Sequence, residues 1–212
     1  ERAGMRTVAF CESDEGKRAI LRKHWPLVPC FPDVEALSGS QIEERVDVIC
    51  GGFPCQDLSN AGRRGGLAGK RRGLWAHFAR LIGEIRPRYI IVENVPGLLV
   101  RGMGEVLGDL ATLGYDAEWD CIPAAAVGAP HLRARIWILA YPSGKRNEAH
   151  DTICAGRPEL VLCSRWASEP IANRVDDGTS GRLVNYAGDA VVPQIPEIIG
   201  RAILRCEGLK AE

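Results

Sequence analysis

Short apolar runs and stretches with helical spacing follow one another along the chain. Five apolar runs have the length and composition of strands. They cover residues 6–11, 46–50, 88–92, 115–122 and 135–141. Four stretches place apolar side chains three or four residues apart, as helices with one buried face do. They cover residues 13–24, 74–85, 103–113 and 191–205. This alternation predicts an α/β fold with a mostly parallel sheet covered by helices.

Residues that start or stop helices support these boundaries. Ser13 is a predicted N-cap, and Trp25-Pro26 ends the same helix. Gly114 follows the third helix, where a glycine caps a C-terminus well. Pro193 and Pro196 are compatible with the last helix only near its first turn.

The periodic pattern is lost between residues 142 and 186, where Gly, Asp, Arg and Pro dominate. A segment of this size and composition buries little core of its own. The chain therefore divides into an α/β unit at 1–141, a short irregular segment at 142–186, and a C-terminal helix at 187–212 that returns to the first unit.

Composition places the chain among soluble globular proteins of one or two domains, with 212 residues, 46% of them hydrophobic and 25% charged. No apolar run approaches the roughly 18 residues of a membrane span, and no signal peptide is visible. The 27 basic and 27 acidic residues balance, so nucleic-acid binding would need a local patch. The best patch is residues 63–72, which contain basic side chains and no acid.

Eight cysteines are scattered without a Cys-x-x-Cys pair, which indicates free thiols in a reducing compartment. His150, Cys154 and Cys163 have a spacing that fits no common zinc template. We therefore predict no metal site.

Cys55 is the first candidate for chemistry, because it follows a predicted strand through Gly51, Gly52 and Pro54. Glycines permit unusual backbone conformations and proline fixes φ, so the thiol is expected on a stiff loop at the carboxyl end of a strand. A thiolate needs a positive or hydrogen-bonding environment, which the basic 63–72 stretch offers. The alternative is a buried cysteine in a tight turn, followed by a solvated basic loop.

Glu93 is the second candidate and follows the apolar run at 88–92. In a strand–helix–strand unit both strands point the same way, so Glu93 and Cys55 are expected to face one crevice. Desolvation would raise the pKa of this carboxyl and let it donate a proton. A thiol and an acid together suit covalent catalysis on an electron-poor ring. The alternative is that Glu93 pairs with an arginine or caps its loop.

Five stretches, in this order, resemble motifs of the DNA (cytosine-5)-methyltransferase family, in its compact phage and bacterial branch. They are Phe-Cys-Glu-Ser-Asp at 10–14, Gly-Phe-Pro-Cys-Gln at 52–56, Glu-Asn-Val at 93–95, His-Leu-Arg-Ala-Arg at 131–135 and Gly-Asp-Ala-Val-Val-Pro-Gln at 188–194. The resemblance covers nearly the whole chain. It implies a Rossmann-like S-adenosylmethionine-dependent methyltransferase sheet, with 1–141 as the catalytic domain and 142–186 as the target-recognition segment.

The resemblance also implies a reaction, the transfer of a methyl group from S-adenosylmethionine to carbon 5 of cytosine in duplex DNA. The Cys55 thiolate adds to carbon 6 of a flipped-out base, while Glu93 contacts ring nitrogen 3 and the exocyclic amine. Arg133 and Arg135 are the implied cations of the pocket. The alternative for these two arginines is a strand edge that faces water.

Cofactor and DNA contacts are implied in the same way. Glu12 is expected at the ribose of S-adenosylmethionine, Asp33 near the adenine, and Pro54 and Leu74 beside the cofactor, although Leu74 or its neighbour Trp75 at helical spacing is also compatible with plain core. The 63–72 stretch resembles a loop that closes over DNA and brings basic groups to phosphates. The implied DNA-binding residues are Gln56, Ser59, Arg63, Arg64, Arg71 and Arg72.

The chain departs from the family pattern in three places. The first motif, an aromatic-x-Gly-x-Gly loop, is not seen, so the sheet is expected to be truncated at its first strand and cofactor binding by residues 1–212 to be weak unless an upstream segment is restored. His131 stands where the family has Gln, and Asp189 where it has Asn.

Two other functions remain open. One is a non-catalytic DNA-binding remnant of such an enzyme, and the other is a cysteine hydrolase that uses Cys55 with His77 or His131. For the methyltransferase, the resemblance implies a monomer in a bacterial or phage-infected cytoplasm, with no membrane association. It would act either beside a cognate restriction endonuclease or as an orphan or phage enzyme.

Overall fold

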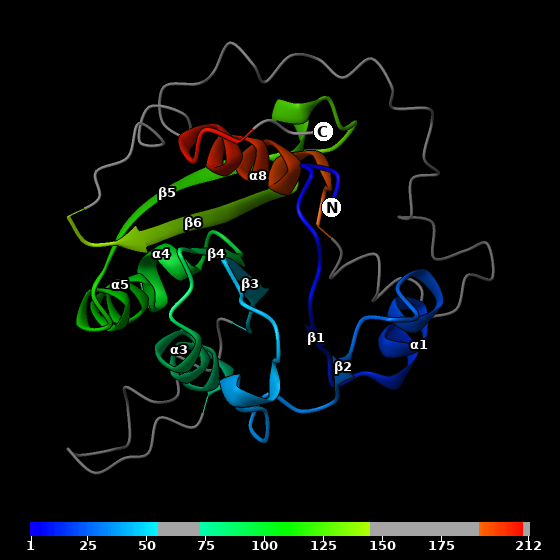
Figure 1. The fold of residues 1–212 in the computed structure, drawn as a ribbon. Coiled ribbons are helices and arrows are strands. Elements are labelled where there is room, and N and C mark those ends of the chain that lie inside the picture. Colours follow the sequence, from blue (N-terminus) through cyan, green and yellow to red (C-terminus); the bar gives the residue numbers. More distant parts are fainter. Residues whose placement is uncertain (55–72, 145–190, 210–212) are drawn as a thin grey trace.

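The computed structural model of the protein describes residues 1–54, 73–144 and 191–209 (Figure 1). The strands are β1 (Phe10–Cys11), β2 (Cys30–Phe31), β3 (Val48–Gly52), β4 (Tyr89–Asn94), β5 (Tyr115–Pro123) and β6 (Ala134–Pro142). The helices are α1 (Glu15–His24), α3 (Leu74–Ile85), α4 (Leu98–Arg101), α5 (Met103–Thr112) and α8 (Gln194–Cys206). Two 3₁₀ turns, η1 (Gly39–Gln41) and η2 (Ala124–Val127), complete the described part.

The main sheet has four strands in the order β3-β4-β6-β5. β3 and β4 run parallel, as expected, whereas β6 runs antiparallel to both of its neighbours. The expectation of a mostly parallel sheet is therefore wrong for these four strands. The chain reverses from β5 into β6 through η2 and a short loop, with no helical crossover, and such a connection produces an antiparallel pair. β1 and β2 form a separate parallel pair.

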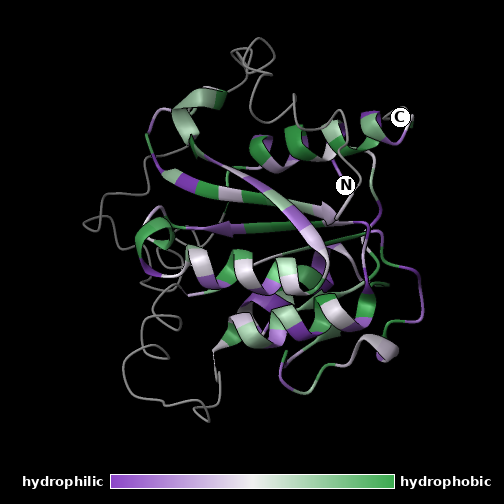
Figure 2. Ribbon diagram, turned by 90° about the vertical axis from the view of Figure 1, so that its left-hand side faces the viewer, coloured by the Kyte–Doolittle hydropathy of each residue, from purple (hydrophilic) through white to green (hydrophobic). Residues whose placement is uncertain are grey.

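Helices cover both faces of the main sheet (Figure 1). On one face, α3 and α5 pack Trp75, Ile82 and Val106 against Val92 and Ile138. On the other face, α8 packs through Ile195, Ile199 and Ile203. β4 is buried on both sides, and for this reason its sequence reads as one continuous apolar run. The helices carry hydrophobic and hydrophilic residues together, as helices with one buried side do (Figure 2).

The N-terminal residues pack on α8. Ala3 is buried, and a Cβ built on Gly200 would lie 2.7 Å from the Cβ of Ala3. The Arg2 guanidinium lies 2.8 Å from Glu197, and Arg201 donates a 3.1 Å hydrogen bond to the carbonyl of Arg2. The first residues of the chain therefore hold the last described helix in place.

Several predicted boundaries are confirmed and others are wrong. α3 spans the predicted 74–85, and Gly114 follows α5 with a φ of 85°. The N-cap of α1 is Asp14, not Ser13, because Asp14 accepts a 2.9 Å hydrogen bond from the amide of Lys17. The 6–11 strand shrinks to two residues, since only β1 finds a partner in β2. The short elements β2 and α4 were not predicted.

Within the described residues, none of the helices has the length and apolar character needed to cross a membrane. In that same part of the chain, no group of three His, Cys, Asp or Glu side chains is placed to hold a metal ion. The five cysteines that the structure describes are free thiols.

Candidate functional site

The carboxyl ends of β3 and β4 form the centre of the candidate site. Gly52 lies directly opposite Glu93 in the parallel register. A Cβ built on Gly52 would lie 3.1 Å from the Glu93 carboxylate oxygen Oε2 and 3.1 Å from the Glu93 carbonyl. Position 52 is therefore a glycine because the Glu93 carboxylate occupies the space above it.

Glu93 forms an ion pair with Arg135, with 3.0 Å between Oε1 and Nε and only 21% of each side chain exposed. The antiparallel register explains the pair: Trp137 lies opposite Glu93, and Arg135 is two residues away on the same face of β6. The alternative interpretation of Glu93, that it pairs with an arginine, is confirmed. A neighbouring cation favours the ionised carboxylate and so opposes the effect of burial.

Asn94 connects this strand end to the turn that leads into Cys55. Its side chain is 3% exposed, and its Nδ2 donates a 2.8 Å hydrogen bond to the carbonyl of Phe53. Its Oδ1 accepts a 2.8 Å hydrogen bond from the amide of Val95. A buried amide with both ends satisfied is rigid, so the backbone at Phe53, two residues before Cys55, is held in one position.

Aromatic packing supports the same turn from the side of α3. The rings of Phe53 and Trp75 lie 5.1 Å apart, and Trp75 donates a 2.9 Å hydrogen bond from Nε1 to Asp109 on α5. Trp75 is 1% exposed and belongs to the core, as the alternative interpretation proposed. Leu74 is 39% exposed at the start of α3, so it remains a candidate contact for a ligand.

Arg133 lies in the loop just before β6, with a φ of 23°, in the left-handed region that non-glycine residues seldom occupy. The carbonyls of Leu132 and Arg133 accept hydrogen bonds from the amide of Ala124, at 2.7 Å and 3.4 Å. Two residues further along, Arg135 makes the ion pair with Glu93.

Glu12 and Asp33, the two acids expected at the cofactor, lie at the same end of the small β1–β2 sheet. Glu12 follows β1, and its amide donates a 2.9 Å hydrogen bond to the carbonyl of Phe31 on β2. Partial burial raises the pKa of the Cys11 thiol, and the negative charges of Asp33 and Glu12 act on it in the same direction. Two carboxylates near one strand end suit the hydroxyls and amines of a nucleoside.

Part of the predicted site lies outside the described residues. Cys55 and the predicted DNA contacts belong to this part, so their roles stay predictions: Gln56, Ser59, Arg63, Arg64, Arg71 and Arg72. The segment 145–190 also lies outside, and Pro54 is the last residue described before the first gap.

The two imidazoles proposed for a hydrolase belong to the described residues, whereas Cys55 does not. His77 faces Glu35, with 3.8 Å between Nε2 and Oε1. His131 is exposed in the loop before β6. The hydrolase alternative, which needs an imidazole beside Cys55, therefore stays a prediction.

Sequence reasoning gave Gly52 only a backbone role and predicted neither the hydrogen bonds of Asn94 nor the Trp75–Asp109 contact. A signal for Asn94 was present, since a polar residue at the end of a buried strand must find hydrogen-bond partners. The partner itself, the backbone carbonyl of the residue after β3, carries no sequence signature.

The chain is similar in sequence to known proteins of one family. A family model described as C-5 cytosine-specific DNA methylase matches residues 1–159. The Type II methyltransferase M2.BsuMI of Bacillus subtilis (strain 168) is 35% identical over 148 residues, which cover 65% of this chain and 37% of that protein. The Type II methyltransferase M.CviJI of Paramecium bursaria Chlorella virus IL3A is 30% identical over 195 residues, which cover 88% of this chain and 50% of that protein.

Among solved structures, a DNMT2 mutant of Spodoptera frugiperda matches with a TM-score of 0.57 and 18% identity, over 69% of this chain and 46% of that one. At this identity the match concerns the fold alone. The chain spans half or less of the length of the curated relatives described above.

Proposed function

The chain belongs to the C-5 cytosine-specific DNA methylase family, and on this basis we propose that the protein transfers a methyl group from S-adenosylmethionine to carbon 5 of cytosine in duplex DNA. The observation that carries the proposal is the Glu93–Arg135 pair above Gly52, at the carboxyl end of two parallel strands. The nucleophile of the proposed reaction, Cys55, is three residues beyond Gly52 in the chain.

The chemical problem is that carbon 5 of cytosine is a poor nucleophile. The Cys55 thiolate adds to carbon 6, and the electron pair of the 5,6 double bond becomes available at carbon 5. When bound, S-adenosylmethionine would supply the methyl group to carbon 5 and leave as S-adenosylhomocysteine. A base such as water takes the proton from carbon 5, and the electron pair of that bond reforms the 5,6 double bond as the Cys55 thiolate departs, so one difficult step becomes two easier ones.

Glu93 acts on the opposite edge of the ring in this proposal. In its protonated form, the carboxyl group donates its proton to ring nitrogen 3 and accepts a hydrogen bond from the exocyclic amine, which neutralises the negative charge that the ring gains as the thiolate adds. Arg135 orients the carboxylate through the 3.0 Å ion pair and has further N–H donors for the base. The guanidinium of Arg135 favours the ionised form of the Glu93 carboxyl group. The arginine must therefore share the carboxyl group with the base when the base binds.

Binding follows from the same family membership. In this proposal Glu12 and Asp33 hold the ribose and the adenine of S-adenosylmethionine, and Pro54 and Leu74 contribute contacts beside it. The target cytosine is flipped out of the duplex, at a cost of a few kcal/mol. Arg133 supports the flipped nucleotide, and the 63–72 stretch contacts phosphates.

The proposed setting is that of a monomer acting on double-stranded DNA in a bacterial or phage-infected cytoplasm, with a cognate restriction endonuclease as the natural companion. The curated relatives support this setting, since both are named Type II methyltransferases.

Covalent trapping tests the reaction. The protein expressed from its complete reading frame is incubated with S-adenosylmethionine and duplex DNA carrying 5-fluorocytosine, in which fluorine blocks release of the enzyme. We expect a denaturant-resistant adduct that Cys55→Ala abolishes and that Glu93→Gln and Arg135→Met slow. Arg201→Met is the matched control, an arginine in an ion pair on α8, and should trap normally. Salt-sensitive DNA binding without any adduct would overturn the proposal and favour the DNA-binding remnant.

A further inference from the structure

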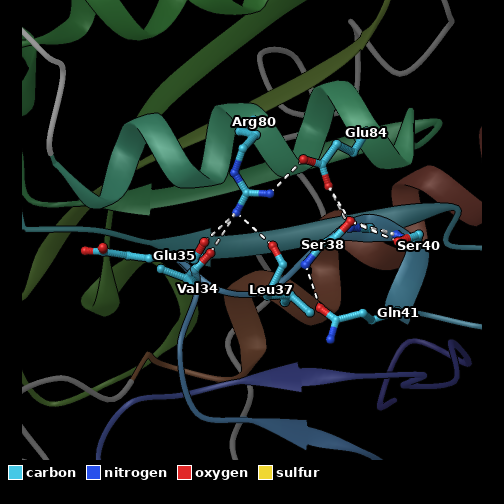
Figure 3. A network of polar contacts seen from close by, with 9 residues as sticks. Val34, Glu35, Leu37, Ser38, Ser40, Gln41, Arg80 and Glu84 are labelled. Atoms are coloured by element: carbon cyan, nitrogen blue, oxygen red, sulfur yellow. Dashed lines mark hydrogen bonds and ion pairs between the residues drawn. The ribbon is translucent and has the colours of Figure 1, made fainter.

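A polar network joins α3 to the loop between β2 and β3 (Figure 3). Arg80, on α3, donates from Nη2 to the backbone carbonyls of Val34 at 2.9 Å and Leu37 at 2.8 Å. Its Nη1 donates a 2.7 Å hydrogen bond to Glu84, one turn further along the same helix. A planar guanidinium can satisfy several acceptors in fixed directions, which a lysine ammonium on a flexible stem does not.

Glu84 binds the next part of the same loop. Its Oε2 accepts a 2.7 Å hydrogen bond from the amide of Gly39 and a 3.3 Å hydrogen bond from the hydroxyl of Ser38. The Gly39 amide and then Arg80 lower the pKa of the Glu84 carboxyl, so the acid is in its ionised, accepting form. Arg80 therefore binds the loop at residues 34–37, and Glu84 binds it at residues 38–39. We refer to Arg80 and Glu84 together as the α3 clasp.

The loop lies in direct contact with the helix. A Cβ built on Gly39 would lie 2.9 Å from Cγ1 of Ile85 and 3.1 Å from the Cβ of Glu84. Leu37 is 5% exposed beneath the clasp. The loop backbone is thus seated on α3 by close contact as well as by hydrogen bonds.

The same loop begins at Asp33, the acid expected at the adenine. Asp33 accepts a 2.8 Å hydrogen bond from the amide of Glu35 through Oδ1, and its carbonyl accepts one from the amide of Leu37 at 3.1 Å. Arg80 binds the carbonyl of the same Leu37. The position of the Asp33 carboxylate is therefore coupled to the clasp through two short hydrogen-bonded turns.

α3 also touches the other half of the site, because Trp75 in its first turn packs on Phe53. One helix thus contacts the turn before Cys55 at its N-terminal end and the Asp33 loop further along. A rigid helix that contacts both segments sets the distance between them.

We infer that Arg80 and Glu84 are positioning residues, which act through the Asp33 loop on the binding of S-adenosylmethionine. The inference rests on the proposed function and adds to it residues that touch neither cofactor nor base. The α3 clasp affects the affinity for the cofactor. The groups proposed for the chemical step, Cys55 and Glu93, are unchanged when the clasp is removed. Its loss should therefore raise the KM for S-adenosylmethionine and leave kcat nearly unchanged.

The test compares Arg80→Met and Glu84→Gln with Arg201→Met, all in the protein from its complete reading frame. Arg201 is a matched control, because it also pairs with a glutamate four residues away and also donates to a backbone carbonyl, that of Arg2. We expect Arg80→Met to raise the KM and the dissociation constant for S-adenosylmethionine by about tenfold, equivalent to one lost charged hydrogen bond. Amide hydrogen exchange at Leu37 and Gly39 should accelerate in Arg80→Met and not in Arg201→Met.

A double-mutant cycle with Asp33→Asn tests whether Arg80 acts on cofactor binding through Asp33. If the clasp acts through Asp33, adding Arg80→Met to Asp33→Asn weakens cofactor binding little further. Additive losses, or unchanged affinity in Arg80→Met, would overturn the inference. If the unsubstituted protein does not bind S-adenosylmethionine at all, the proposed function fails and the inference fails with it. If the unsubstituted protein and Arg80→Met bind S-adenosylmethionine with equal affinity, only the inference fails.

Discussion

Phe53 directly follows β3, and the side-chain amide of Asn94, the last residue of β4, donates a 2.8 Å hydrogen bond to the Phe53 carbonyl. The strand that carries the acid of the proposed site thereby fixes the segment that leads toward the proposed nucleophile. The contact joins the residue after Glu93 to the residue two before Cys55 in the sequence.

Replacing Asn94 by leucine should destabilise the protein by roughly 1–3 kcal/mol, because the buried Phe53 carbonyl would be left without its partner. Urea denaturation gives the free energy of unfolding. Thr112→Val is the control, since it removes an exposed hydrogen bond from a side chain to the carbonyl of Gly108 and should change stability far less. An equal loss in the two variants would show that the buried contact has no special weight.

Gly52→Ala tests the space reserved for the Glu93 carboxylate. The new methyl group would lie 3.1 Å from Oε2 and from the carbonyl of Glu93, so the Glu93–Arg135 pair must shift and the rate of adduct formation with 5-fluorocytosine DNA should fall. The matched substitution is Gly108→Ala on α5, where no heavy atom lies within 4 Å of the added carbon. That control should be stabilised by about 0.5–1 kcal/mol, as expected for alanine within a helix. Normal trapping by Gly52→Ala would contradict the assignment.

Gly200→Ala tests the packing of the N-terminal residues on α8. The added Cβ would lie 2.7 Å from the Cβ of Ala3. The positions of both atoms are fixed by the backbone, so no change of rotamer can relieve the contact. We expect a loss of about 1–3 kcal/mol in the free energy of unfolding, as for other overpacked sites. Ala3→Gly should restore part of it, and a double-mutant cycle measures the coupling. No coupling would mean that the two segments do not touch in solution.

Stability at high pH should depend on Tyr89. Burial and then the hydrogen bond to Glu207 raise the pKa of Tyr89 to about 12, against about 10 for the unfolded chain. The protonated phenol is therefore favoured by folding, and its contribution is complete below pH 10 and is lost as the pH rises from about 10 to 12. Unfolding by urea at a series of pH values should show this decline.

Tyr89→Phe should flatten that decline, because phenylalanine has no proton to lose. Burial also raises the pKa of Tyr115, so a smaller slope should remain in Tyr89→Phe and become smaller again when Tyr115→Phe is added. The same slope in the unsubstituted protein and in Tyr89→Phe would refute the assignment.

Local structure was the part of the fold that sequence patterns predicted well. α3 was predicted at both ends, because its apolar residues recur at helical spacing. The order of the strands was not predicted, since the insertion of β6 between β4 and β5 is decided by packing against helices on both faces. β6 is buried along most of its length, so the run 135–141 is continuously apolar, a pattern that is more typical of parallel strands.

The site was predicted in its residue types but not in its contacts. Glu93 and Arg135 were each singled out, and their ion pair arises from an antiparallel register that periodicity does not encode. Gly52 illustrates the difference: its role depends on a carboxylate that approaches from the next strand. In the sequence, Arg80 and Glu84 have only the spacing of an ion pair within a helix. Their proposed role comes from their contacts with the loop between β2 and β3.

The place of β6 in the sheet has a consequence for synthesis of the chain. β4 and β5 do not pair with each other, and the strand that joins them is the last of the six described to leave the ribosome. Until residues 134–142 emerge, the nascent chain exposes two apolar strand edges, a state prone to mispairing and to capture by chaperones. The Glu93 carboxylate meets the Arg135 guanidinium only when that strand inserts, so the ion pair of the proposed site cannot form before the sheet closes.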